Sequence, residues 1–259
     1  MTTHTRKSSS NSVRSLERGL EILRAFRPGT DLLGNGELAE KTGLSKSTVS
    51  RLTQTLVQSG FLYKDEQAKA YRLAAPVLSL SHTIKTSSPI LQVAQPLMVA
   101  LSEKLQLNIG LAVADSCEMV YLEAVRYNKK TALRNIVMGH RVPMELTSLG
   151  RAWLAANKPE IREKTLEELK VHRSKDWGKI SSEINQAILE TLEKKYCSTA
   201  WLPEVVAIST PIEINNHPIY VLNMSRTTKE DLNSFARNHS KELLNLAKEI
   251  KTKVSNLNQ

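Results

Sequence analysis

The chain has 259 residues, a hydrophobic fraction of 41% and a formal net charge of +10. This length accommodates one large domain or two ordinary domains with packed cores. No run of 18 apolar residues occurs, which argues against a membrane span, and two cysteines, Cys117 and Cys197, are too few for a disulfide framework.

The positive charge is concentrated near the N-terminus. Residues 1–72 carry 12 Lys and Arg against 7 Asp and Glu, and the remaining residues carry 24 against 19. Each part therefore has a net charge of +5, but the charge density is more than twofold higher in the first part. A basic segment beside a nearly balanced one favours a polyanion-binding module attached to a second function.

The first predicted elements are a polar arm and a helix. Residues 1–11 lack an apolar signal core, so we expect a disordered arm and a protein that stays in the cytoplasm, associated with the nucleoid. The spacing of apolar residues predicts a helix over 13–27, which Pro28 and Gly29 end. The apolar stripe of this helix consists of Leu16, Leu20, Leu23 and Phe26.

Residues 36–52, GELAEKTGLSKSTVSRL, have the pattern of a helix-turn-helix motif. A short helix over 36–42 meets a Thr-Gly-Leu turn, and a second helix over 45–59 follows, rich in Ser, Thr, Lys and Arg. Two short strands at 61–64 and 70–73 then form a hairpin. We therefore predict a winged helix-turn-helix domain over 12–74, with the motif at 33–52, that places its second helix in the DNA major groove.

The face of this second helix that reads DNA follows from its apolar spacing. Val49, Leu52 and Leu56 mark the buried side, which leaves polar residues that suit base edges on the opposite side. A solvated polar face on a structural helix is the alternative, but it does not explain the turn and hairpin around it. The predicted DNA-binding residues are Lys46, Ser47, Thr48, Ser50, Arg51 and Gln54 of the helix, and Lys69 and Arg72 of the hairpin.

After residue 74 the pattern changes to mixed helices and strands. We assign 75–90 to a linker helix and 91–257 to a second domain, in which strands and helices do not alternate strictly, as in an α+β fold. An amphipathic helix from Ile90 to Leu105 opens this domain. The remaining predicted elements are strands at 108–114, 118–126 and 131–137, a loop at 138–146, helices at 148–156, 159–171 and 179–195, strands at 204–212 and 217–225, and a helix at 228–254.

The order of these elements resembles the IclR family of bacterial transcriptional regulators, over roughly residues 12–254. The resemblance rests on SVRSLERGLEIL (12–23), on the helix-turn-helix segment, on YRLAAPVLSL (71–80) and on MGHRVPMELTSLGRAWLAA (138–156), where Arg151 replaces the usual Lys. It implies a GAF-like second domain that binds a small organic or aromatic acid. The implied partners are double-stranded operator DNA and further copies of the chain in a homodimer or tetramer. We expect the effector to control either operator binding or a contact with RNA polymerase.

The resemblance also implies where the effector binds. The corresponding positions are Thr147, Ser148 and Leu149 at the start of a helix, and Asn223 and Ser225 on the last strand. A helix N-terminus suits a carboxylate, although Thr147 would also serve as an ordinary N-cap. Asn223 stands where a hydroxyl residue is frequent, so the ligand chemistry is expected to differ.

Residues 198–212, STAWLPEVVAISTPI, resemble the branch that includes activators of phenylpropionate and related aromatic-acid catabolism. Arg126 and Arg141 are candidates to meet an anionic effector, with surface positions as the alternative. The sequence contains no metal-ligand spacing, P-loop or dinucleotide fingerprint, so we expect no cofactor and no enzymatic activity. The competing functions are a non-specific DNA-packaging protein and, less consistent with the sequence, an enzyme for a small molecule with a DNA-binding appendage.

Overall fold

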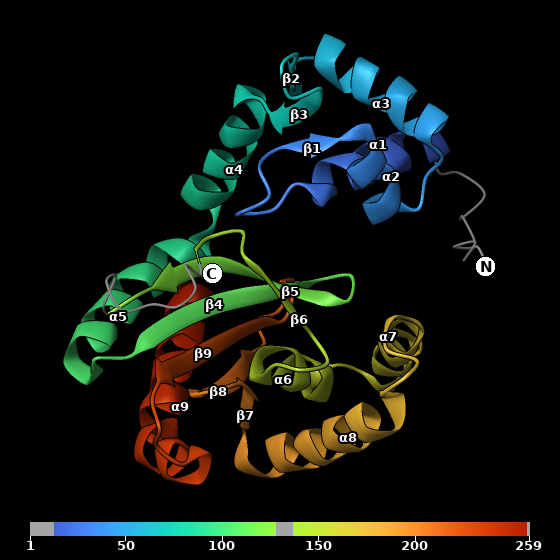
Figure 1. Cartoon of the computed structure of the whole chain (residues 1–259). Helices are drawn as coiled ribbons and strands as arrows, with labels where there is room; N and C mark the ends of the chain where they lie inside the picture. The colour runs from blue at the N-terminus through green and yellow to red at the C-terminus, as the bar shows by residue number, and fades with distance from the viewer. Residues whose placement is uncertain (1–12, 128–136, 258–259) are drawn as a thin grey trace. The chain divides into compact units, whose positions relative to one another are not determined.

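The computed structural model describes residues 13–127 and 137–257, and the chain divides into two compact units, Met1–Lys85 and Thr86–Gln259 (Figure 1). The disordered arm expected at 1–11 lies outside the described residues, as does the strand expected at 131–137 apart from its last residue.

The N-terminal unit contains a helix-turn-helix followed by a hairpin. Its three-stranded antiparallel sheet has the order β1-β3-β2, so the hairpin is extended by a short strand from before the motif. This arrangement confirms the winged form of the motif. The elements are α1 (Arg14–Ala25), β1 (Leu33–Gly34), α2 (Asn35–Thr42), α3 (Lys46–Gln58), β2 (Leu62–Asp65), β3 (Ala70–Leu73) and α4 (Ala75–Ser87).

The core of this unit is small and comes from α1, α2 and α3 and from the three strands. Ile22, Leu38 and Val49 are fully buried, which confirms the predicted inner side of α3. The stripe predicted for α1 is only partly inside, because Leu16 is 62% and Leu20 49% exposed. The apolar residues near the start of α1 therefore remain on the surface of this unit.

The C-terminal unit is built on one antiparallel six-stranded sheet of order β6-β5-β4-β9-β8-β7. This mixed architecture confirms the α+β prediction. Its elements are α5 (Pro89–Leu105), β4 (Asn108–Asp115), β5 (Glu118–Val125), β6 (Arg141–Pro143), α6 (Ser148–Ala156), α7 (Pro159–His172), α8 (Trp177–Lys194), β7 (Cys197–Leu202), β8 (Val205–Ile212), β9 (Tyr220–Thr227) and α9 (Leu232–Leu257).

Two strands correct the sequence prediction. The segment expected to be a loop at 138–146 contains β6, which pairs with β5, and β7 adds an edge strand before β8 where none was predicted. Both lie at the outer edges of the sheet, where strands are short and their sequence pattern is weak.

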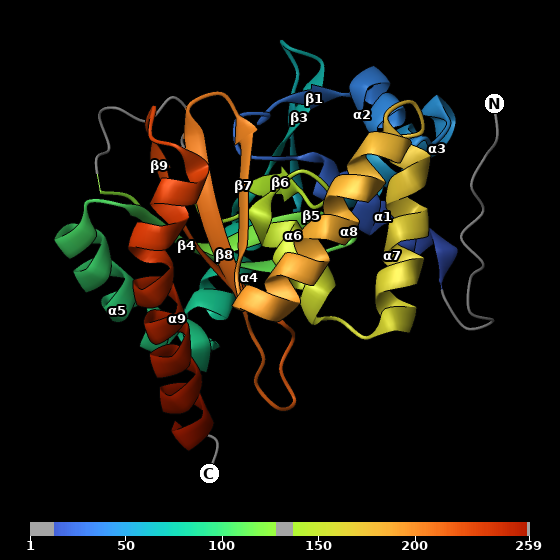
Figure 2. The ribbon, with the colours of Figure 1, turned by 90° about the horizontal axis from the view of Figure 1, so that it is seen from below.

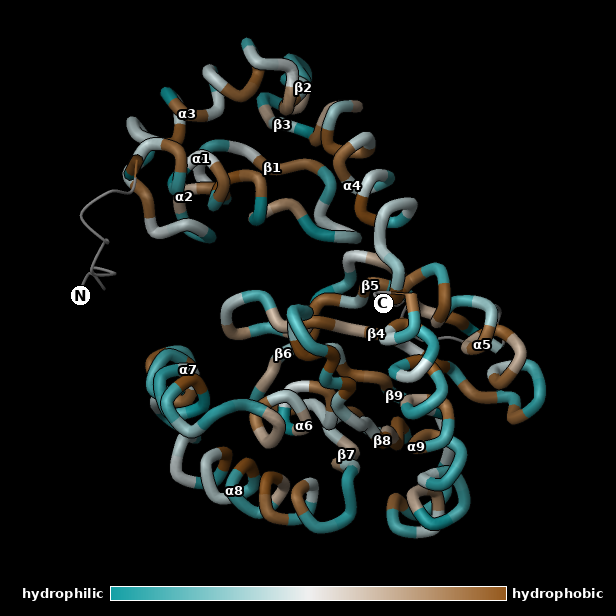
Figure 3. The backbone as a smooth tube through the Cα atoms, turned by 180° about the vertical axis from the view of Figure 1, so that it is seen from behind, coloured by the Kyte–Doolittle hydropathy of each residue, from teal (hydrophilic) through white to brown (hydrophobic). Residues whose placement is uncertain are grey.

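Helices cover both faces of this sheet (Figures 1 and 2). Helices α5 and α9 pack on one face through a cluster that includes Met98, Ile208 and Phe235. Helices α6 and α8 lie over the other face, where Met119 and Ile184 are buried. In Figure 3, hydrophobic and hydrophilic residues alternate along α8 and α9, as expected for helices that pack one face on a sheet. Among the helices that the structure describes, none is both long enough and apolar enough to cross a bilayer.

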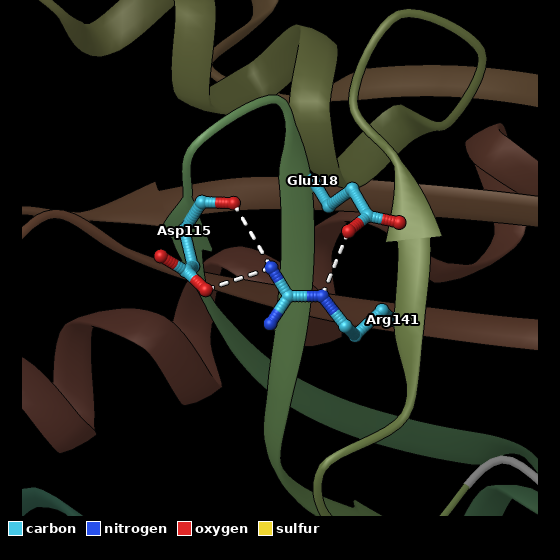
Figure 4. A network of polar contacts seen from close by, with 3 residues as sticks. All are labelled: Asp115, Glu118 and Arg141. Atoms are coloured by element: carbon cyan, nitrogen blue, oxygen red, sulfur yellow. Dashed lines mark hydrogen bonds and ion pairs between the residues drawn. The ribbon is translucent and has the colours of Figure 1, made fainter. Parts of the chain in front are cut away.

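The hairpin of β4 and β5 is tied to β6 by a network of charged groups (Figure 4). The Arg141 guanidinium donates hydrogen bonds to Asp115 Oδ2 at 2.7 Å and to Glu118 Oε2 at 2.8 Å. Burial lowers the pKa of Arg141, but these two carboxylates outweigh that effect and the net change is upward. Arg141 therefore holds the edge strand against the hairpin.

Candidate nucleic-acid interface and ligand cavity

Helix α3 is positioned by its two ends and by the turn before it. Gly43 has a φ of +68°, the left-handed conformation that ends α2 and favours glycine. Ser45 caps α3 by accepting a hydrogen bond from the Thr48 backbone N–H at 3.2 Å. The direction of α3 relative to α2 is thus set by local backbone chemistry, as expected for a helix-turn-helix motif.

The outer face of α3 carries the polar residues that the sequence predicted. Ser47, Ser50, Arg51 and Gln54 are all exposed, and so is Lys46 at the start of the helix. The sequence of α3, KSTVSRLTQTLVQ, contains two basic residues and no acidic one. The face is therefore electropositive and offers donors and acceptors of the kinds that pair with base edges. Thr48 is half-buried, and its hydroxyl lies 2.9 Å from Ser45 Oγ within the N-terminal cap.

In the wing, the two predicted residues have different surroundings. Lys69 is exposed in the turn between β2 and β3 and has a φ of +49°. Arg72 is paired with Asp31 at 3.3 Å and with Asp65 at 3.6 Å. Lys69 is thus available to a phosphate, whereas Arg72 would have to exchange its carboxylates for one.

The C-terminal unit contains a cavity of about 740 Å³ on the sheet face that α6 covers. Its lining comes from all six strands of the sheet, from the start of α6, and from residues that follow α5 and β5 or link β7 to β8. Cavities of this volume accommodate small organic ligands. The five residues predicted to contact an effector, which lie far apart in the sequence, all line it: Thr147, Ser148, Leu149, Asn223 and Ser225.

At the start of α6, the side chains are engaged in holding the helix. The Thr147 hydroxyl accepts a hydrogen bond from the Gly150 N–H at 3.3 Å and donates one to the Pro143 carbonyl at 2.9 Å. The Ser148 hydroxyl lies 2.8 Å from the hydroxyl of Ser209 on β8. Thr147 therefore is the N-cap that the sequence allowed as the alternative. Apart from the Gly150 N–H, which the Thr147 hydroxyl caps, the first turn offers a ligand its backbone N–H groups, which have no carbonyl acceptor within the helix.

Gly150 and Arg151 fix α6 above the sheet. A Cβ at Gly150 would overlap the backbone of Met144, so only glycine allows this approach. The buried Arg151 donates to the Glu145 carbonyl at 3.0 Å and to Glu183 on α8 at 2.7 Å. Arg151 thus links α6 to α8. It is not among the residues that line the cavity.

Tyr121 on β5 and Arg126, which directly follows β5, both line the cavity, and a bulge in β5 lies between them. The pairing of β5 with β4 shifts register so that Ala112 faces Tyr121 and Leu111 faces Glu123, which leaves an extra residue in β5. Such bulges re-aim side chains near binding sites. Tyr121 is 5% exposed, and the pKa of its hydroxyl is raised by burial.

The electrostatics of the cavity favour an anion. No acidic residue occurs among the described residues that line it, whereas two arginines do, Arg126 and Arg226, of which Arg226 also donates to the Leu105 carbonyl at 3.0 Å. Burial lowers the pKa of Arg126, but a guanidinium stays protonated in proteins. A partly dehydrated cation in a lining without carboxylates is complementary to a carboxylate ligand.

The outcomes for the two candidate arginines differ. Arg126 lines the cavity, whereas Arg141 is held by Asp115 and Glu118 and does not. Two further lining residues, Tyr121 and Trp201, were not singled out in the sequence. Tyr121 depends on a bulge that leaves no trace in the alternation of the strand, and Trp201 lies on the edge strand that the sequence did not reveal.

Comparison with known proteins agrees with both units. Residues 15–66 match the model of the IclR helix-turn-helix domain, and residues 82–255 match that of the bacterial transcriptional regulator IclR C-terminal domain. The chain is similar to the HTH-type transcriptional regulator TsaQ1/TsaQ2 of Comamonas testosteroni, with 36% identity over 70% of this chain. The matched part spans 65% of that relative's length.

Two solved structures share the fold. An IclR family transcriptional regulator from Brucella abortus has 30% identity and a TM-score of 0.83, covering 99% of this chain and 96% of that one. An IclR homolog from Microbacterium hydrocarbonoxydans, solved in complex with 4-hydroxybenzoate, has 18% identity and a TM-score of 0.68, covering 93% and 98%. The second likeness is one of fold alone.

Proposed function

The chain belongs to the IclR family, and from that premise we propose that it is a sequence-specific DNA-binding transcriptional regulator controlled by a small organic acid. The observation that carries this proposal is the cavity in the C-terminal unit, which is lined by Arg126, Arg226 and a helix N-terminus and by no carboxylate among the described residues. We propose that the polar face of α3 in the N-terminal unit is the surface that binds DNA.

On DNA, the proposed roles follow from residue type and exposure. Arg51 would pair with a guanine and Gln54 with an adenine in the major groove. Lys46, Thr48 at the helix start and Lys69 of the wing would contact phosphates, which set the register of the protein on the duplex. Ser47 and Ser50 would contact neighbouring base edges. Arg72 would contact a phosphate after its ion pairs with Asp31 and Asp65 break.

In the cavity, the proposed ligand is a carboxylic acid with an apolar or aromatic body. Arg126 and the first turn of α6 would receive the carboxylate, because both favour negative charge. Leu149, Trp201 and Leu202 supply an apolar wall for the body of the ligand. The family member solved with 4-hydroxybenzoate supports an aromatic acid as the starting choice.

We also propose that the working form is a homo-oligomer with at least two copies. Apolar residues are left on the surface of the N-terminal unit, on α1 and α4; on α4, Leu78 is 73% and Ile84 56% exposed. Leu80 and Ile84 are four residues apart and so lie on the same side of α4, as Leu16 and Leu20 do on α1. A second copy that covers these helices would present two reading helices to operator half-sites, from which the bound regulator would act on RNA polymerase.

A salt titration of duplex binding, combined with thermal shifts, tests the proposal. The full-length protein should prefer duplexes from the region upstream of its own gene. Its affinity should fall steeply as the salt concentration rises, because binding releases counterions from the DNA and this release is less favourable at high salt. Aromatic carboxylic acids should raise its melting temperature. Equal affinity for all duplexes would favour the DNA-packaging alternative, and a melting temperature unmoved by every acid would contradict the effector class.

A further inference from the structure

The carboxylate of Glu145 is buried beside the start of α6, in the segment that joins β6 to this helix. Glu145 is 4% exposed and lies two residues before Thr147, the N-cap. A Cβ on Gly150 would overlap the Met144 backbone up to the carbonyl carbon to which Glu145 is bonded, so this segment packs against the first turn of α6. A negative charge therefore lies close to the proposed anion-binding helix end, although Glu145 does not line the cavity.

Two arginines from different elements hold Glu145. Arg173, the residue after α7, donates from its Nε to Glu145 Oε1 at 2.7 Å. Arg151 of α6 donates to the backbone carbonyl of Glu145 at 3.0 Å, and its own charge is paired with Glu183 on α8 at 2.7 Å. Since Arg151 has a carboxylate partner of its own, the group that neutralises the Glu145 carboxylate is Arg173.

Helix α7 determines where Arg173 lies. Thr165 and Leu169 are the buried residues of α7, and both are in its second half. The backbone N–H of Arg173 donates to the Leu169 carbonyl at 3.1 Å, so the arginine continues directly from the turn that is anchored in the core. Its side chain is 42% exposed, whereas that of Glu145 is 5% exposed. The ion pair therefore joins a buried carboxylate to a cation that comes from the surface.

This pairing affects the electrostatics of the cavity. A carboxylate that is removed from water needs a cation or several donors beside it. With Arg173 in place, the pair adds no net charge near the start of α6, and the positive end of the helix dipole remains available to an anion. Without Arg173, an unpaired negative charge would lie near the N–H groups that receive the carboxylate, and like charges repel more strongly where water is excluded.

We propose that Arg173 is a positioning residue of the effector site, which acts through Glu145 and does not touch the ligand. By neutralising Glu145, it keeps the start of α6 able to bind a carboxylate. The inference rests on the proposed effector function and adds a residue outside the cavity on which the affinity for an anion depends. Because the dependence is on charge, a neutral ligand of the same shape should not be affected.

Isothermal titration of the full-length protein tests this at pH 8, where carboxylates are ordinarily ionised. Benzoate, 3-hydroxybenzoate and 4-hydroxybenzoate are compared first, and the tightest-binding benzoate is then used together with its amide as the neutral probe. Arg173→Met removes the charge and keeps much of the side-chain length, so it should weaken binding of the acid by about fivefold. Binding of the amide should be unchanged.

Lys170→Met is the matched control for the loss of one positive charge. Lys170 is exposed in the last turn of α7, three residues before Arg173. A charge in this position is screened by water and salt, so its removal should leave the affinity for both probes unchanged.

A double variant separates the effect of charge from that of structure. Adding Glu145→Gln to Arg173→Met removes the unpaired charge but leaves the ion pair broken. If the pair acts through charge, the affinity for the acid should return to within about twofold of the wild-type value. If the pair only holds the segment before α6 in place, the double variant should bind as weakly as Arg173→Met, and the inference is wrong.

The outcomes distinguish this inference from the proposed function. If no acid binds the wild type, the effector class is wrong and this inference falls with it. If the acids bind and Arg173→Met keeps the wild-type affinity, or loses the amide as much as the acid, this inference is wrong while the effector class stands. Should Arg173→Met fail to fold, Glu145→Gln alone decides, since it should bind the acid at least as tightly as the wild type and weaker binding would overturn the inference.

Discussion

The polar face of α3 and the cavity of the C-terminal unit differ in how their residues are spaced along the chain. Ser47, Ser50, Arg51 and Gln54 lie within about two turns of one helix, where the 3.6-residue period determines which side chains share a face. Tyr121, Thr147 and Asn223 are far apart in sequence and meet only because the sheet and α6 bring them together.

The difference also concerns energy. Side chains on the face of α3 are exposed, so changing them should alter binding and leave folding almost unchanged. Tyr121, Thr147 and Asn223 in the cavity are buried and pack beside the core, so changing them should affect both binding and folding. Substitutions in the two regions should therefore have different effects on stability and on binding.

The largest effect is expected for Gly150→Ala. The new Cβ would overlap the Met144 backbone and displace α6, at a cost of about 3 kcal/mol. For a unit of this size the melting temperature should fall by roughly 5–10 °C in a calorimetric scan. Gly178→Ala is the control: Gly178 lies in α8 with nothing within 4 Å of its added Cβ, so alanine should leave the melting temperature unchanged or raise it slightly. Equal responses of the two variants would contradict the close approach at α6.

Arg51→Ala should remove discrimination between sequences without changing stability. Losing one bidentate contact with a base costs about 2 kcal/mol, or roughly 30-fold in the ratio of operator to random-duplex affinity. Fluorescence anisotropy with both duplexes measures that ratio, and a thermal scan checks that folding is intact. An unchanged ratio would exclude Arg51 from base recognition.

Lys69→Ala should produce a smaller and uniform effect. A phosphate contact carries no sequence information, so affinity for the operator and for random duplex should weaken by the same factor. The slope of log affinity against log salt should become shallower by about 1. If this variant changed the ratio of the two affinities, the wing would be reading sequence as well.

The smallest expected effect is a difference in reactivity between the two thiols. It tests whether reagents in solution can reach the core of the C-terminal unit. Burial raises the pKa of the Cys197 thiol to about 12, so at pH 8 almost none of it is thiolate, the reactive form. Cys117 is half-buried. A disulfide reagent at pH 8 should therefore modify Cys117 first, and Cys197 only after unfolding. Two thiols reacting at the same rate in the native protein would contradict a closed core around β7.

The two regions also differ in how well the sequence predicts them, because the residues of α3 are close together in the sequence and those of the cavity are far apart. The structure contains the predicted helix-turn-helix, exposed face of α3 and wing at nearly the predicted boundaries, because local periodicity and turn residues define them. The predicted α1 stripe was partly wrong, since Leu16 and Leu20 are exposed and the periodicity of one helix does not say what covers it. The proposed dimer supplies such a cover.

For the cavity, the resemblance to the family supplied Thr147 and Asn223, and the residues alone did not. Tyr121 joins them through a bulge, and Trp201 through an edge strand, and neither feature follows from alternation of polar and apolar residues. The sequence also did not predict the partners of Arg141. Asp115 and Glu118 lie on the β4–β5 hairpin, and they come close to Arg141 only because β6 pairs with β5. Contacts between strands depend on register, which a single sequence specifies weakly at sheet edges.

The central claim is that an acid in the cavity controls binding by α3, and one measurement tests it most directly. The affinity of the full-length protein for a duplex from its own upstream region should be determined without ligand and at saturation with the tightest-binding benzoate, with saturation verified by calorimetry. A ligand that binds two conformations differently should change this affinity by about 5–150-fold, in either direction. Identical affinities at verified saturation would show that the cavity and the reading helix are not coupled.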